Sequence, residues 1–120
     1  MKELREDRRP GVWYRITFDN GQHSFYRDYF NGFGSGNYAF FLDGQCVYVG
    51  QAIDIKVRMR SHIKMMRYQH CWQTTWGQFH EFIVAVRKEK YRFERLTLEA
   101  RLVHRIRPVF NKYLKGDHAS

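Results

Sequence analysis

A chain of 120 residues, 43% of them hydrophobic, is long enough for one domain with a modest core. No apolar run approaches the roughly 18 residues of a membrane span, and the charged start MKELREDRRP does not resemble a secretory signal, so we expect a cytoplasmic protein without a membrane partner. Within a net charge of +9, residues 55–120 carry fifteen Lys and Arg against five Asp and Glu, which favours a polyanionic partner over the alternative of a merely basic, soluble surface.

The first predicted elements form an N-terminal extension over residues 1–34. Residues 12–18 alternate in the manner of a β-strand, and Asn20-Gly21 is a hairpin signal because both positions accept positive φ. A second strand or short turn is expected through residues 22–29. The glycine-rich stretch 31–36 predicts a loop that leads into the core.

Two more strands and a helix come next. Residues 38–42 and 46–49 are strand-like, and Asp43-Gly44 between them is a second pair suited to a tight hairpin. Asp54 is a credible N-cap for the helix that follows. Apolar and histidine side chains then recur at helical spacing, at Ile55, Met59, His62, Ile63 and Met66.

The segment 68–78 contains Trp72 and Trp76 and few charges, and its pattern predicts no particular element. Its two indole rings can pack on the sheet or stack on exposed bases, and the sequence leaves both readings open.

The last elements are a strand over residues 79–86, with Phe82, Val84 and Val86 on one face, and a helix over about 91–106. The helix should end before Pro108, because proline disfavours helical geometry in its predecessor. Its apolar stripe contains a carboxylate, in the order Leu96, Glu99, Val103, Ile106. Such a carboxylate is costly unless it pairs with a cation, either an arginine such as Arg58 or a metal ion.

These elements predict an α/β domain. We expect a central three-stranded antiparallel sheet flanked by helices over residues 35–115, preceded by the N-terminal hairpin and followed by a flexible tail, 116–120.

The stretch 35–62, SGNYAFFLDGQCVYVGQAIDIKVRMRSH, resembles the signature of the GIY-YIG endonuclease superfamily. Gly36-Asn37-Tyr38 stands where that family has its first triplet, and Tyr48-Val49-Gly50 where it has its second. Arg58, Glu99 and Asn111 fall where it has its helix arginine, its glutamate and its closing asparagine, so the resemblance spans roughly residues 35–111. The chain departs from the pattern at Asn37, which replaces Ile, and in the nine residues between Tyr38 and Tyr48, slightly fewer than usual.

The resemblance implies a divalent-metal-dependent DNA endonuclease that leaves 5′-phosphate and 3′-hydroxyl ends. Tyr38 would activate the attacking water, directly or through a proton relay, and Tyr48 would orient that network. Arg58 would grip the scissile phosphate with its planar fork of donors. Glu99 would be the protein ligand of one magnesium or manganese ion, a hard cation that prefers oxygen. Each of these residues also has a plain structural reading, as a strand aromatic, a helix cation or a paired carboxylate.

Other residues have supporting roles in this interpretation. His62, four residues after Arg58, would share proton transfer with Tyr38 or only hydrogen-bond the phosphate. Structural support of the site is expected from Gly36, Gly50 and Asn111, the last through side-chain hydrogen bonds. Contacts to the nucleic-acid backbone are expected from the remaining basic residues near the predicted helix, Lys56, Arg60, Lys64 and Arg67.

Two other functions stay open at this point, a non-catalytic nucleic-acid-binding module on the same fold and an RNase. The expected partner is DNA, duplex or branched. The small size favours low sequence specificity or a protein partner that supplies it.

Overall fold

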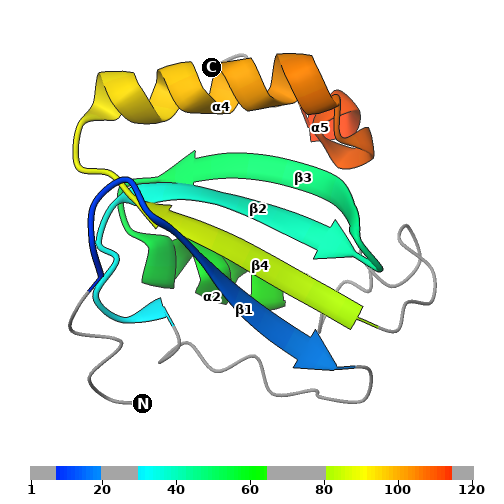
Figure 1. Ribbon diagram of the computed structural model, residues 1–120, viewed down its shortest axis with the longest axis horizontal. Helices are drawn as coiled ribbons and strands as arrows, with labels where there is room; N and C mark the ends of the chain where they lie inside the picture. Colours follow the sequence, from blue (N-terminus) through cyan, green and yellow to red (C-terminus); the bar gives the residue numbers. More distant parts are fainter. Residues whose placement is uncertain (1–7, 20–29, 65–80, 115–120) are drawn as a thin grey trace.

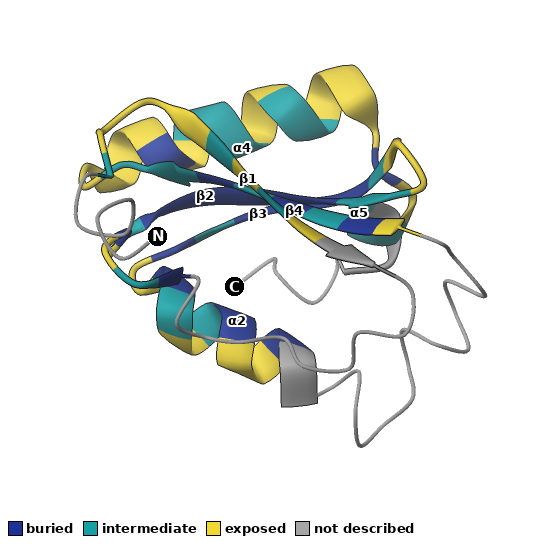
Figure 2. Ribbon diagram, turned by 60° about the horizontal axis from the view of Figure 1, so that its bottom comes forward, coloured by how far each residue is buried: buried dark blue, intermediate teal, exposed yellow. Residues whose placement is uncertain are grey.

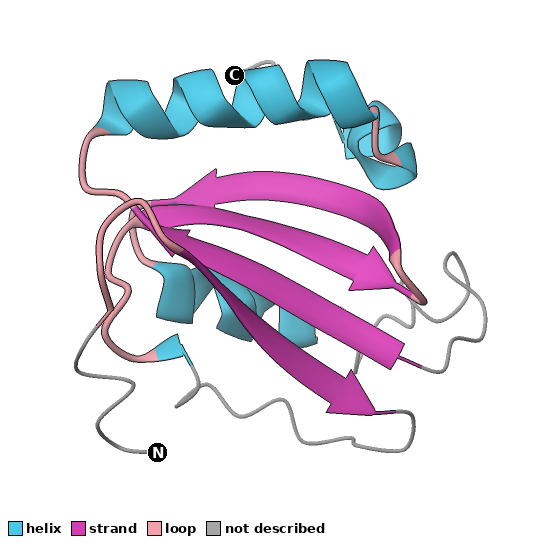
Figure 3. Cartoon of the chain, viewed as in Figure 1, coloured by secondary structure: helices cyan, strands magenta, loops and turns pink. Residues whose placement is uncertain are grey.

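The computed structural model describes residues 8–19, 30–64 and 81–114. Its strands form one antiparallel sheet in the order β1-β4-β2-β3 (Figure 1, Figure 3). The strands are β1 (Trp13–Asp19), β2 (Gly36–Leu42), β3 (Gln45–Ala52) and β4 (Glu81–Lys88).

Helices cover both faces of this sheet. One face carries α2 (Ile55–Lys64), and the other carries α4 (Arg92–Ile106), as Figure 2 shows. The short α5 (Val109–Leu114) packs with α4 against β3. The predicted α/β class, with an antiparallel sheet between helices, is therefore confirmed. No helix in the described ranges is long and apolar enough to cross a membrane.

The sheet has one strand more than the predicted core, because β1 pairs along its whole length with β4. Residues 12–18 were expected to form the first strand of a hairpin ahead of a three-stranded sheet, whereas β1 extends that sheet to four strands. The predicted turn at Asn20-Gly21 and the second strand over 22–29 lie outside the described residues. The same holds for the segment 68–78 with its two tryptophans and for the tail 116–120.

The β2–β3 hairpin closes as its turn residues predict. Asp43 and Gly44 have φ angles of 48° and 88°, as a turn with two left-handed residues requires. A register shift follows within the pair, so that Phe40 lies opposite Tyr48 whereas Phe41 lies opposite Cys46. Beyond this irregularity the pairing is regular up to Gly36, which fixes the positions of both glycine–tyrosine triplets.

The hydrophobic core lies between the sheet and α2. Asp54 directly precedes helix α2, and its carboxylate accepts a hydrogen bond of 3.2 Å from the Val57 N–H, as predicted for an N-cap. The Ile55 N–H donates to the Gly34 carbonyl over 2.7 Å and joins the helix start to the loop before β2. Fully buried side chains on this face include Phe33, Phe40, Ile55, Met59, Val84 and Val86.

Helix α4 ends where expected but presents a different face to the sheet. Arg107 adopts a left-handed conformation with φ 53° and caps the helix directly before Pro108. The predicted stripe was wrong at its two ends, since Leu96 and Ile106 are exposed. Leu98 and Leu102 are apolar too, so residue type alone could not decide which stripe faces inward. The side chains that are buried or half-buried on α4 belong to Arg95, Thr97, Leu98, Glu99, Leu102 and Val103.

Candidate active site

Two glycines allow the close packing on which the candidate site is built. The β2–β3 register places Tyr38 opposite Gly50, and a Cβ atom on Gly50 would lie 2.6 Å from both Cζ and the hydroxyl oxygen of Tyr38. The tyrosine ring therefore lies over the glycine, where any side chain would displace it. A Cβ atom on Gly36 would clash with the carbonyl oxygen of Arg87 on the neighbouring strand.

Four rings meet beneath the sheet, from β2, β3 and α2. Tyr38, Phe40, Tyr48 and His62 have ring centroids 5.0 to 6.0 Å apart, within the range of favourable aromatic contacts. All four side chains are buried, Tyr38 and Phe40 completely. The hairpin and the helix thus fix the positions of the four rings relative to each other.

Within this cluster the hydroxyl of Tyr38 and Nε2 of His62 form a hydrogen bond of 2.9 Å. Burial, helped by the nearby Arg58 guanidinium, lowers the pKa of His62 to about 3, so the imidazole is neutral near pH 7. Burial and the neighbouring Tyr48 raise the pKa of Tyr38 well above its usual value, although Arg58 opposes them. A phenol that keeps its proton and a neutral imidazole make a natural donor–acceptor pair.

A positive and a negative side chain shift the pKa values of the two tyrosines. The half-buried Arg58 interacts with the hydroxyl of Tyr38 and lowers its pKa, against the dominant effect of burial. The pKa of Tyr48 is raised by burial and, to a smaller extent, by the Glu99 carboxylate from α4. The structure therefore brings together Tyr38, Tyr48, Arg58, His62 and Glu99, from two strands and two helices.

The donors present suit a hard divalent cation. Glu99 is half-buried, and its charge raises the pKa of Tyr48. Within residues 8–19, 30–64 and 81–114, no group of three or more His, Cys, Asp or Glu side chains could hold a metal ion. A single carboxylate fits an ion that keeps most of its water, as magnesium does, and differs from the four-ligand cage of a structural zinc site.

Asn111 from α5 is bonded to the second triplet from outside the sheet. Its Oδ1 accepts a hydrogen bond from the Val49 N–H, and its Nδ2 donates to the Val49 carbonyl, both over 2.8 Å. The side-chain amide thus takes the place of a neighbouring strand beside β3. Because Val49 precedes Gly50 and follows Tyr48, these two bonds hold the middle of the triplet in place.

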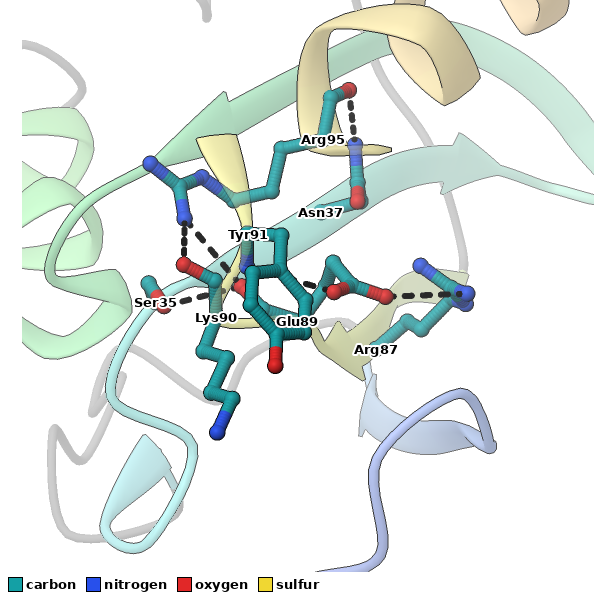
Figure 4. A network of polar contacts seen from close by, with 7 residues as sticks. All are labelled: Ser35, Asn37, Arg87, Glu89, Lys90, Tyr91 and Arg95. Carbon is teal, nitrogen blue, oxygen red and sulfur yellow. Dashed lines mark hydrogen bonds and ion pairs between the residues drawn. The ribbon is translucent and has the colours of Figure 1, made fainter. Parts of the chain in front are cut away.

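A buried cation that the sequence analysis missed lies on the opposite face of the sheet (Figure 4). Arg95 is only 4% exposed, and its guanidinium donates to Oε1 of Gln51 at 3.0 Å and to the carbonyls of Lys90 at 2.8 Å and Glu89 at 3.3 Å. Its own carbonyl accepts a hydrogen bond of 2.9 Å from Nδ2 of the buried Asn37. The guanidinium and the amide together fasten the start of α4 to β2, β3 and the loop after β4.

This network lies directly behind the candidate site. Asn37 precedes Tyr38, Gln51 follows the second triplet, and Arg95 lies one helical turn before Glu99. The network also gives a physical reason for Asn in place of Ile in the first triplet, since only a polar side chain can bond to the Arg95 carbonyl. The signal that could have revealed it was that polar residue together with an arginine four positions before Glu99.

The remaining predicted residues lie on α2 or beyond it. Lys56 is half-buried and Arg60 is exposed. The side chains of Lys64 and Arg67 lie outside the described part of the chain.

Comparison with known proteins agrees with this geometry. The family model of the UvrC-like GIY-YIG domain matches residues 34–112. Among solved structures, the chain is similar to the GIY-YIG N-terminal endonuclease domain of UvrC from Thermotoga maritima, a point mutant bound to its catalytic divalent cation. The two share 25% sequence identity with a TM-score of 0.51, over 66% of this chain and 83% of that one. No curated protein matches the chain.

Proposed function

Because the chain belongs to the GIY-YIG superfamily of nucleases, we propose that it is a divalent-metal-dependent endonuclease that hydrolyses DNA phosphodiesters to 5′-phosphate and 3′-hydroxyl ends. The observation that carries the proposal is the 2.9 Å hydrogen bond between Tyr38 and a neutral His62, beside the Arg58 guanidinium. The similar UvrC domain is an endonuclease with a catalytic divalent cation, which supports the same reaction class.

Arg58 binds the scissile phosphate in this proposal. It is half-buried, and its side chain interacts with the Tyr38 hydroxyl. A planar fork of donors suits two phosphoryl oxygens, and the bonds strengthen as charge builds up on them in the transition state. The phosphate bound by Arg58 would thereby lie beside the hydroxyl of Tyr38, close to the water that attacks it.

Tyr38 and His62 handle the proton. The phenol keeps its own proton at neutral pH, so it serves as a relay that accepts a hydrogen bond from the water while donating to Nε2 of His62. An arriving anionic phosphate would raise the pKa of His62, because a nearby negative charge stabilises the imidazolium. The imidazole thus becomes a better proton acceptor only when substrate is bound.

Glu99 is the residue that would hold the divalent cation, magnesium or manganese, with water as its other ligands. When bound, such an ion stabilises negative charge on the leaving oxygen. Tyr48 lies between this carboxylate and Tyr38, where its hydroxyl orients the hydrogen bonds around the phosphate.

The outer surface of α2 is proposed to contact the nucleic-acid backbone. Arg60 is exposed and Lys56 is half-buried, whereas Ile55 and Met59 on the core side of the helix are fully buried. Together with Lys64 and Arg67 they would position the duplex without reading its sequence. Specificity would then come from the shape of the substrate or from a protein partner.

The test is incubation of the protein with supercoiled plasmid in magnesium and, in parallel, in chelator. We expect nicked and linear products in magnesium only, formed much more slowly by the Arg58→Ala variant. Ligation of the products without end repair checks the 5′-phosphate ends. Plasmid that is bound but not cut would contradict the proposal in favour of a binding module, and cleavage of RNA alone would make the protein an RNase.

A further inference from the structure

Three exposed aromatic side chains gather at the end of the sheet where α4 begins. Trp13 is 41% exposed, Tyr91 59% and Phe93 75%. A chain of contacts joins their positions: the Tyr91 N–H donates to Glu89 over 3.2 Å, Glu89 pairs with Arg87 at 3.4 Å, and Arg87 lies opposite Trp13 in the sheet (Figure 4). The three rings therefore share one end of the molecule.

Cations alternate with these rings. The sequence Lys90-Tyr91-Arg92-Phe93 is exposed at every position, and Arg15 follows Trp13 on the same face of β1. The Lys90 ammonium lies 5.0 Å from the centre of the Tyr91 ring. Two carboxylates in the described ranges lie nearby, and Glu89 forms an ion pair with Arg87. Of these two, Glu94 alone therefore balances the charge of three exposed cations, Arg15, Lys90 and Arg92.

The patch, defined as Trp13, Arg15, Lys90, Tyr91, Arg92 and Phe93, lies outside the hydrophobic core cluster. In the described part of the chain its three rings pack against no other ring, and each of the three residues is at least 41% exposed, so part of every ring is open to a ligand. Flat rings among cations suit a strand with both a charged backbone and free base faces, because bases stack on the rings while phosphates meet the cations. A paired duplex hides its base faces, and an uncharged apolar partner would leave the cations unmatched.

The patch lies at the same end of the sheet as the start of α2, the helix that carries Arg58, although α2 covers the opposite face (Figure 1). Helix α2 begins directly after β3 ends, and its first N–H is bonded to the Gly34 carbonyl just before β2. The start of β1 is bonded to the end of β4 at this same end, through Gly11 and Lys88. Two strand spacings, about 10 Å, separate β1 from β2.

We propose that this patch binds an unpaired stretch of nucleic acid that leaves the scissile duplex at Arg58. The substrate class is therefore DNA with a single-stranded part, such as a flap, a gap or a branch. The link to cleavage rests on the proposed nuclease function, whereas the binding itself does not.

The test measures the affinity of the full chain for labelled oligonucleotides by fluorescence anisotropy in chelator, so that nothing is cut. The variant is Trp13→Ala with Tyr91→Ala and Phe93→Ala. The control removes two apolar side chains, each 41% exposed, at the end of α4 and the start of α5, Ile106→Ala with Val109→Ala. A Tyr91→Ala and Phe93→Ala variant, with β1 intact, covers the case in which loss of Trp13 lowers stability.

Loss of one stacking ring weakens binding by roughly fivefold or more. We expect the patch variants to lower the ratio of single-strand to duplex affinity by tenfold or more, and the control to leave that ratio unchanged. Equal weakening of single strand and duplex, or a ratio equal to that of the control, would overturn the proposal.

Cleavage assays separate this proposal from the proposed function. In magnesium, the wild-type chain should cut a flapped duplex faster than a blunt one, and the patch variants should lose that preference. Selective single-strand binding without any cleavage would support the patch as a single-strand site and contradict the nuclease function. If the patch variants keep the wild-type affinity ratio and still cleave in magnesium, the nuclease proposal is supported and the patch proposal is rejected.

Discussion

Lowering the pH from 7 to 5 should destabilise the protein through one buried imidazole. The pKa of His62 is about 3 in the folded chain, against an ordinary value near 6.5. Between these values the unfolded chain binds a proton that the folded chain does not, so the free energy of unfolding falls as the pH falls. At pH 5, about 1.5 pH units below the ordinary value, this difference amounts to about 2 kcal/mol.

Urea denaturation at pH 7, 6 and 5 measures this loss, and the His62→Gln variant isolates it. The amide of Gln can still accept a bond from Tyr38 but does not titrate. The described side chains around the imidazole include Tyr38, Tyr48 and Arg58, which are present in both proteins, so the comparison isolates the titration of His62. The free energy of wild type should therefore fall by about 2 kcal/mol more than that of the variant. If the free energy of unfolding depends on pH equally in the two proteins, His62 is not buried in its neutral form.

Three further predictions concern single side chains. Gly50→Ala places a methyl group against the Tyr38 ring, which should lower the free energy of unfolding by about 1–3 kcal/mol and reduce cleavage further than that loss explains; melting curves with cleavage rates check it. Arg58→Ala should slow single-turnover cleavage by about 3 kcal/mol of activation free energy, whereas Arg60→Ala mainly weakens DNA binding, and similar rates for both would contradict the assignment. Arg95→Met leaves buried acceptors without donors and should cost about 3 kcal/mol in chemical denaturation; a loss below 0.5 kcal/mol would mean that the network contributes little.

Features that depend on a few neighbouring residues could be predicted from the sequence. The turn at Asp43-Gly44 follows from the tolerance of both residues for positive φ, and the start of α2 follows from the Asp54 side chain. The alternation of Phe82, Val84 and Val86 likewise marks the core face of β4. Each of these signals is complete within one segment, so no knowledge of the packing partner is needed.

Features that depend on how elements pack could not be predicted in this way. Burial of Arg95 requires Gln51 and two carbonyls from other elements, and a lone arginine on a helix normally indicates a solvated surface. The inward face of α4 was similarly ambiguous, because apolar residues spread over more than half of the helix circumference, with Leu96 and Leu98 on nearly opposite sides. The pairing of β1 with β4 joins segments more than sixty residues apart, for which the strand pattern carries no register signal.

The measurement that tests the account most directly is magnesium-dependent cleavage by the Glu99→Gln variant, with manganese binding followed by calorimetry. The amide preserves the shape of a half-buried side chain on α4 but removes the anionic oxygen that a hard cation needs. We expect the variant to fold and bind DNA like wild type, to lose manganese binding, and to lose cleavage by several orders of magnitude. A folded variant that still cleaves within about tenfold of wild type, with manganese bound, would contradict Glu99 as the metal ligand.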